Sequence, residues 1–335
     1  MANSYITPNF LIKDSSAFRD YRSVVNGSGT TVIFERSSPK DSEDDCTLYS
    51  LDLATGAVTQ FLTGTSAPLY SSRPDWCWQN GNVAFNCVMQ AGDKTVIGYT
   101  SDGSETSLVP ETAGMFYPTW FPPPPNPQVL AVMNSSGKTL PVPNTSEVDL
   151  DGNLDSSALA GSGLWAGMPS INQMATNLIA FAGQPTQTSG SYSQDLNYIW
   201  WLDTATQDSV SPLETGAPSS GLFMPQFQGR APSWSPDGKW IAFESNRAHQ
   251  PSTSNPGGLY SIFLYEVNGS NPAIQITDPA YNANHAKWYP NGFNGVSGSP
   301  TLTVAAYAPD DNGTPAPPYA LASLDVSSIV GGSST

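Results

Sequence analysis

Oxygen-bearing side chains alternate along one short segment and could bind a cation. Asp149, Asp151, Asn153 and Asp155 occupy every second position of this segment. Hard oxygen ligands that converge on one point suit Ca²⁺. The spacing departs from the common calcium loop, because the glycine is fourth rather than sixth and no glutamate occupies the twelfth position. Two hypotheses remain for these residues, a calcium site and a solvated acidic loop.

A second set of residues combines cationic, aromatic and proton-accepting groups. Its members come just before a recurring sequence element and are Asp20, Tyr21, Arg73, Phe116, Tyr117, Arg230 and His285. Arginine forks suit carboxylates, and aromatic faces suit sugar rings or apolar groups. In an enzyme, His285 or Tyr117 would act as the base, while Arg73 or Arg230 would neutralise a carboxylate. In the alternative, the set fills and hydrates a structural channel.

The recurring element is clearest at residues 230–247, where a strand, a tight turn and a second strand follow one another. Pro236, Asp237 and Gly238 form the turn, because proline presets φ, aspartate caps nearby backbone and glycine accepts positive φ. Trp234 before the turn and Phe243 after it can share an apolar face. The sequence therefore predicts a β-hairpin here.

Weaker copies of this hairpin recur along the chain. Their second strands are anchored at Val32, Val83, Leu130, Ile179, Ile241 and Val304, at intervals of 51, 47, 49, 62 and 63 residues. A propeller blade of four strands with its loops needs about 40–50 residues. Most copies also carry a second hairpin, which would be the outer half of a blade, and only the third copy lacks a clear one. The sequence predicts a single all-β, six-bladed propeller with four-stranded antiparallel blades, with a β-sandwich or a seven-bladed ring as alternatives.

The blades are expected near residues 13–63, 68–110, 113–160, 164–215, 226–278 and 283–330. Residues 1–12 would supply the outer strand of the last blade and so close the ring, which removes exposed sheet edges. Residues 331–335 are expected to be a disordered tail. In such a ring the inner strands line a central channel, and the residues before each hairpin turn surround its mouth.

The segment from Trp234 to Lys239, followed by Ile241-Ala242-Phe243, resembles the WD40-like repeat of TolB-like propellers. The later run from Tyr265 to Ser270 shares this resemblance. It implies the same six-bladed fold and a role as an interaction platform in the bacterial envelope. Some propeller polysaccharide lyases use several channel histidines with a metal, whereas only His285 is placed for that here.

The composition limits the partners. The formal net charge is −16, with 12 Lys plus Arg against 28 Asp plus Glu, so nucleic acid and anionic membranes would be repelled. No apolar run is long enough to span a membrane. The start lacks a leader pattern, so the protein is cytoplasmic, or it is periplasmic or extracellular with its leader removed. Cys46, Cys77 and Cys87 are too few for a disulfide-built fold, and a Cys77–Cys87 bridge competes with two buried thiols.

The sequence leads to two function classes. The first is a monomeric, non-catalytic propeller that binds a protein, peptide or glycan at its channel mouth, with no certain cofactor and Ca²⁺ as the one candidate. The second is a polysaccharide lyase or hydrolase on the same ring. The fold alone does not choose between them, since one fold hosts many activities.

Overall fold

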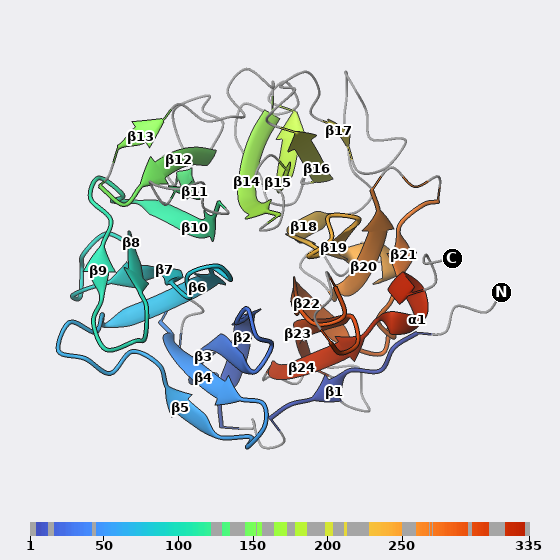
Figure 1. Cartoon of the computed structure of the whole chain (residues 1–335), viewed down its shortest axis with the longest axis horizontal. Coiled ribbons are helices and arrows are strands. Elements are labelled where there is room, and N and C mark those ends of the chain that lie inside the picture. Colours follow the sequence, from blue (N-terminus) through green and yellow to red (C-terminus); the bar gives the residue numbers. More distant parts are fainter. Residues whose placement is uncertain are drawn as a thin grey trace.

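A computed structural model describes residues 5–12, 17–41, 45–121, 129–134, 145–151, 153–155, 164–172, 178–185, 198–203, 211–212, 228–249, 259–267, 269, 271–293, 297–307 and 319–331. Its strands form six four-stranded antiparallel sheets, arranged around a common centre in Figure 1. Within each sheet the strands follow chain order from the centre outward, except in the sheet that contains both ends of the chain.

The first three blades come from the N-terminal half. The first has β2 (Arg19–Val25), β3 (Thr31–Ser37), β4 (Thr47–Asp52) and β5 (Val58–Gln60). The second has β6 (Tyr70–Trp76), β7 (Val83–Val88), β8 (Val96–Thr100) and β9 (Ser107–Leu108). The third has β10 (Met115–Trp120), β11 (Val129–Asn134), β12 (Thr145–Asp149) and β13 (Leu154–Asp155).

The other blades follow the same plan. The fourth has β14 (Leu164–Ile171), β15 (Leu178–Pro185), β16 (Tyr198–Asp203) and β17 (Ser211–Pro212). The fifth has β18 (Gly229–Trp234), β19 (Trp240–Ser245), the short helix η2 (Asn246–His249), β20 (Ser261–Glu266) and β21 (Ile274–Gln275). The last has β22 (Asn282–Trp288), β23 (Thr301–Tyr307) and β24 (Ala320–Asp325), followed by α1 (Ser327–Val330).

The two ends of the chain meet in the last blade. Its outermost strand is β1 (Asn9–Phe10), which pairs antiparallel with β24. The Leu11 N–H also donates to the Leu321 carbonyl, at 2.9 Å, and the Ile6 N–H to the Ile276 carbonyl, at 2.7 Å. Residues 332–335 of the expected tail lie outside the described residues. None of the helices in the described part of the chain is long and apolar enough to cross a membrane.

The blade plan expected from the sequence needs correction in the third blade. An outer hairpin is present there, because β12 and β13 pair antiparallel with Val148 opposite Leu154. The turn between them contains the alternating acidic residues. One Asp149 carboxylate oxygen accepts the N–H groups of Asp151 and Asn153, at 3.0 and 2.8 Å, and the other accepts the Asn153 side-chain amide, at 2.7 Å. The sequence does contain a hairpin signal here, Asp151-Gly152, which the interpretation of this segment as a calcium loop overlooks.

Tryptophan side chains join neighbouring blades near the centre. The Trp120 indole N–H donates to the Asp75 carbonyl at 3.2 Å, and the Trp288 indole N–H donates to the Ser233 carbonyl at 3.0 Å. These tryptophans are 0% and 2% exposed. Each bond therefore satisfies a buried donor while the ring fills space between two blades.

Candidate functional site

Each inner strand carries a bulge at the same place. The strand pairing shifts register on β2, β6, β10, β14, β18 and β22. Within each shift one residue other than glycine has positive φ. These six residues, here called the axial ring, are Arg22, Arg73, Tyr117, Met168, Ala231 and His285, with φ of 33°, 51°, 55°, 50°, 46° and 50°. Such residues rarely adopt this conformation, and its concentration at one site indicates a functional or structural constraint.

A side chain from the preceding blade holds several of these bulges in place. The Arg73 N–H donates to Glu35 Oε1 at 2.5 Å, and the His285 N–H donates to Glu244 Oε2 at 2.7 Å. The Tyr117 N–H donates to Asn86 Oδ1 at 3.1 Å. Glu35, Asn86 and Glu244 all lie on the second strand of their blades and are buried. These hydrogen bonds satisfy N–H groups that the bulges release from the sheet.

The axial ring surrounds a cavity of about 50 Å³, here called the ring cavity. All six ring residues line it, together with the residue that follows each one, which is proline in four blades, and with Lys287. A buried water needs about 10–15 Å³, so the ring cavity has room for about four water molecules or for one carboxylate group.

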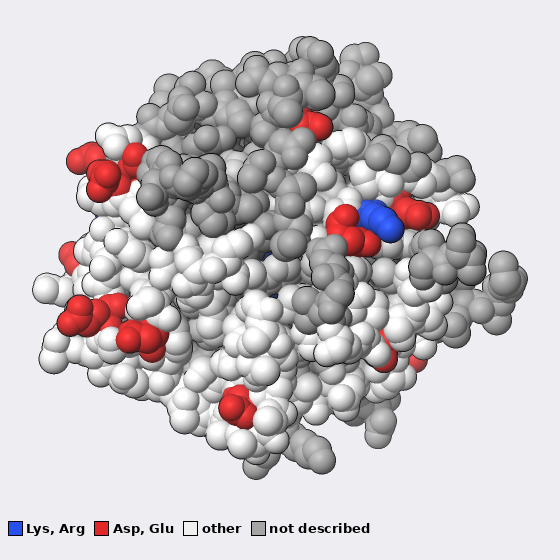
Figure 2. Space-filling model, viewed as in Figure 1, with Lys and Arg blue, Asp and Glu red and all other residues white. Residues whose placement is uncertain are grey.

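Cationic side chains concentrate at the ring cavity although the chain is strongly acidic. Arg22, Arg73 and Lys287 line it, and Arg230 lies one residue before Ala231. These four are a third of the twelve Lys and Arg residues in the chain. On the outer surface the picture differs, since the charged side chains visible in Figure 2 are few and mostly acidic. The channel is therefore the place where an anion would be attracted.

Three of these cations are paired with buried carboxylates. Arg22 Nη1 lies 2.8 Å from Glu35 Oε2, and Arg230 Nη2 lies 2.8 Å from Glu244 Oε1. Lys287 Nζ lies 3.7 Å from Asp75 Oδ1. The Arg73 guanidinium stacks against aromatic rings, at 4.6 Å from the Tyr117 centroid and 5.6 Å from the Phe116 centroid. The same guanidinium donates to Ser72 Oγ at 3.4 Å and hydrogen-bonds the Tyr117 hydroxyl.

The titratable groups of the ring respond to this positive charge. Burial, together with Arg22, Arg230, Arg73 and Lys287, lowers the pKa of His285 well below its usual value, so its imidazole is neutral at pH 7. Burial alone would raise the pKa of Tyr117, but the charges of Arg73 and Arg22 and a hydrogen bond from Arg73 outweigh it and lower that pKa. A neutral imidazole and an acidified phenol thus face the same cavity.

The structure brings together some of the predicted site residues and separates others. Arg73, Tyr117 and His285 line the ring cavity, with Phe116 beside Arg73. Tyr21 packs edge-on against His285, with ring centroids 4.7 Å apart. Asp20 serves a structural role, because it is fully buried and accepts two hydrogen bonds from Arg36, at 2.7 and 2.8 Å. Burial raises the pKa of Asp20 against the opposing effect of Arg36.

The predicted set also needs one correction and several additions. Arg22, not Tyr21, occupies the axial position of the first blade. The prediction counted back from a proline, and the first blade has Ser23 where four other blades have proline. Lys287 was missed; it follows His285 by two residues, and both line the ring cavity. Glu35 and Glu244 were missed because nothing local marks a residue that caps the next blade.

The candidate calcium residues lie apart from this site, on the outer hairpin of the third blade. The hydrogen bonds of Asp149 explain its presence as a turn-stabilising residue. Among the described residues, no group of three or more His, Cys, Asp or Glu side chains could hold a metal ion. Ca²⁺ binding by Asp149, Asp151, Asn153 and Asp155 stays a prediction. Cys46, Cys77 and Cys87 are buried free thiols.

No protein-family model matches the chain, and no curated protein matches it. Solved structures do. Oligogalacturonate lyase from Vibrio parahaemolyticus is similar over 97% of this chain and 99% of its own, with a TM-score of 0.52 and 10% identity. An oligogalacturonate lyase in complex with manganese is similar over 92% and 77%, with a TM-score of 0.50 and 9% identity.

TolB from Acinetobacter baumannii is similar over 75% of this chain, with a TM-score of 0.49 and 13% identity. The chain spans about half of that protein, 52% of its length. The chain has the β-propeller fold. The β-propeller fold predicted from the repeated hairpin is confirmed. Identities this low carry no information on ligand or activity.

Proposed function

We propose that the chain is a non-catalytic binding propeller that receives a carboxylate group of a protein, peptide or glycan ligand in its ring cavity. The observation that carries this proposal is the convergence of Arg22, Arg73, Arg230 and Lys287 at the channel of a chain with net charge −16. The monomeric state and a periplasmic or extracellular location stay predictions.

The ring cavity, of about 50 Å³, is large enough for a carboxylate group. The remainder of the ligand would lie at the opening of the ring cavity. An acidic peptide or a uronate-containing glycan carries such a carboxylate.

The test is a binding titration with an acidic peptide and with oligogalacturonate, on wild type and on Arg73→Met. Losing one charge-assisted hydrogen bond costs about 1.5–3 kcal/mol, so affinity should fall about 10- to 150-fold. Lys239→Met is the matched control, since its side chain is 64% exposed and lies outside the cavity. Equal weakening in both variants would mean a general charge effect and would contradict the proposal.

A second candidate is a lyase that acts on a uronate polymer. The observation that favours it is the pairing of neutral His285 with Tyr117, whose pKa is lowered, in one cavity. A base would remove the proton next to the carboxylate, a C=C bond would form, and the glycosidic oxygen would leave with a proton. The similar lyases add fold-level support only. Unsaturated product detected by ultraviolet absorbance, and lost in His285→Ala, would replace the binding proposal with this one.

A further inference from the structure

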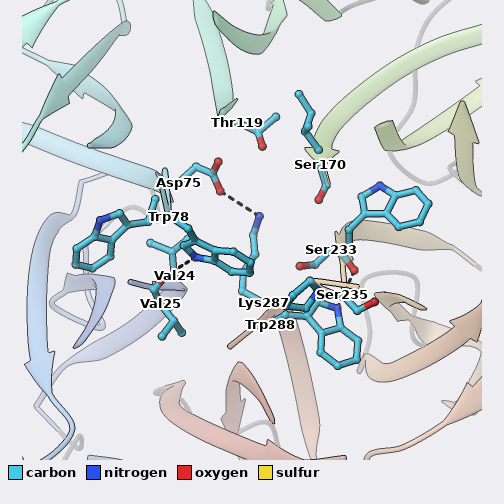
Figure 3. Close-up of a pocket in the computed structure, with 14 residues that line it drawn as sticks. Val24, Val25, Asp75, Trp78, Thr119, Ser170, Ser233, Ser235, Lys287 and Trp288 are labelled. Atoms are coloured by element: carbon cyan, nitrogen blue, oxygen red, sulfur yellow. Dashed lines mark hydrogen bonds and ion pairs between the residues drawn. The ribbon is translucent and has the colours of Figure 1, made fainter. Parts of the chain in front are cut away.

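A second cavity lies at the opposite end of the inner strands, near the hairpin turns. It measures about 40 Å³ and is here called the turn-side cavity. Its wall includes the residues two positions after the axial ring, which strand alternation returns to the channel side. These are Val24, Asp75, Thr119, Ser170, Ser233 and Lys287, and Figure 3 shows them around a common centre.

Three hydroxyl groups from successive blades face this centre. Figure 3 shows the side chains of Thr119, Ser170 and Ser233 with their oxygens directed inward. The three residues are only 3–4% exposed. The Thr119 hydroxyl donates to the Asp75 carboxylate. Buried hydroxyls need hydrogen-bonding partners, and each of the three can both donate and accept. Their convergence produces a wall that matches other hydroxyl groups.

An ion pair completes the polar wall. Lys287 Nζ lies 3.7 Å from Asp75 Oδ1, and the other Asp75 oxygen accepts the Trp120 N–H at 2.9 Å. Lys287 supplies donors and Asp75 supplies acceptors within one small space. Because the two charges cancel, the pair gives the cavity no net charge and does not favour an ionic ligand. Lys287 also lines the ring cavity and thus separates the two cavities.

Two indole side chains flank the polar wall. Trp78 and Trp288 line the turn-side cavity, and Figure 3 places them on either side of Lys287. Their N–H groups donate to the Val25 and Ser233 carbonyls, at 2.9 and 3.0 Å. The rings therefore present carbon surface to the cavity. Carbon surface beside converging hydroxyls and a charge-balanced pair matches the alternating C–H and O–H groups of a sugar.

We propose that the turn-side cavity is a second binding site, which takes the hydroxyl-bearing end of a neutral sugar. The volume of about 40 Å³ admits a hydroxymethyl group or part of a vicinal diol, while the sugar ring rests at the opening beside Trp78. This site is independent of the carboxylate site in the ring cavity, because only Lys287 is common to both.

Saturation-transfer NMR on the full chain tests the proposal with methyl glycosides of glucose, galactose, mannose and N-acetylglucosamine as probes. At least one glycoside should receive magnetisation from the protein, with a Kd on the order of 1 mM. The double variant Ser170→Ala/Ser233→Ala should weaken that binding about 10-fold or more, since it removes two hydrogen bonds. Ser107→Ala, on an exposed outer strand, is the matched control and should bind as wild type does.

The same double variant should keep wild-type affinity for the acidic peptide, because Ser170 and Ser233 lie outside the ring cavity. That readout separates this proposal from the carboxylate proposal and shows that the variant is folded. No transfer to any glycoside would overturn the proposal and leave a water-filled structural cavity. Transfer that is undiminished in the double variant, or displaced by acetate, would overturn it as well.

Discussion

Glu244 is the residue on which the energetics of the candidate site can be tested most directly. Its side chain is fully buried. Glu244 Oε1 lies 2.9 Å from Arg230 Nε and 2.8 Å from Arg230 Nη2, while Glu244 Oε2 accepts the backbone N–H of His285 at 2.7 Å. Glu244→Gln keeps the shape and one acceptor oxygen but removes the charge. We therefore expect the bulge at His285 to persist while Arg230 loses its counter-ion.

The magnitude follows from the burial of the pair. Removing one partner of a buried ion pair costs about 3–5 kcal/mol. The Arg230 side chain keeps 20% exposure, so water compensates part of the loss, and we expect about 2–3 kcal/mol. Unfolding entropy of about 2.1 cal/mol/K per residue over this chain makes each kcal/mol worth about 1.4 °C, so the Tm should fall by about 3–4 °C.

Urea unfolding followed by tryptophan fluorescence measures the change, with Glu105→Gln on the exposed surface as the control. The double variant Arg230→Met/Glu244→Gln completes a double-mutant cycle, which isolates the interaction free energy between these two side chains from their interactions with other residues. It should be less destabilised than the two single changes added together, by about 1 kcal/mol or more, because no uncompensated charge remains. A Glu244→Gln stability within about 0.5 kcal/mol of wild type, or additive single changes, would refute the reasoning.

Three further predictions concern stability. The pKa of His285 is lower in the folded protein than in the unfolded chain, so its contribution to stability is complete above pH 6.5 and declines as pH falls below it. Wild type should therefore lose up to about 1.4 kcal/mol of unfolding free energy per pH unit relative to His285→Gln, measured by urea unfolding between pH 7 and 5, and equal pH dependence of the two proteins would contradict this. Comparison with the variant removes the contributions of Asp20 and Asp75, whose raised pKa values act in the opposite direction. Deleting residues 1–12 should lower the free energy of unfolding by more than about 3 kcal/mol in the same assay, because β1 completes the last sheet and Phe10 packs on its core. An unchanged Tm would contradict this prediction. Gly238→Ala should lower stability by about 1 kcal/mol or more in thermal melting, because φ is +71° and the new Cβ would lie 2.6 Å from Asn172 Nδ2. In Gly56→Ala the new Cβ meets no neighbour, so this control should lose less stability.

The hairpin turns could be predicted from the sequence because their causes are local. At the clearest copy, Ser235 Oγ accepts the Trp240 N–H at 2.9 Å and contacts Asp237, while Gly238 supplies positive φ. Every partner lies within six residues along the chain. Proline, aspartate and glycine therefore mark the turn without any knowledge of the other blades.

The bulges of the inner strands could not be predicted in this way. Bulky side chains such as Tyr117 disfavour positive φ, so local preference indicates a regular strand. The conformation is held by Asn86 or Glu244 from another blade, more than 30 residues away in sequence. The sequence repeat predicted where the axial ring lies along the chain. It could not predict which carboxylates neutralise the arginines there, because those partners are distant in sequence.

The bulge on each inner strand also governs how such a channel can diversify. In three blades the bulge is held through its backbone N–H by a partner on the preceding blade, an interaction that does not depend on the side chain at the bulge. The six positions are substituents on one common frame. Met168 and Ala231 now contribute no charge, and exchanging either for a charged or polar residue would change the selectivity of the channel one blade at a time.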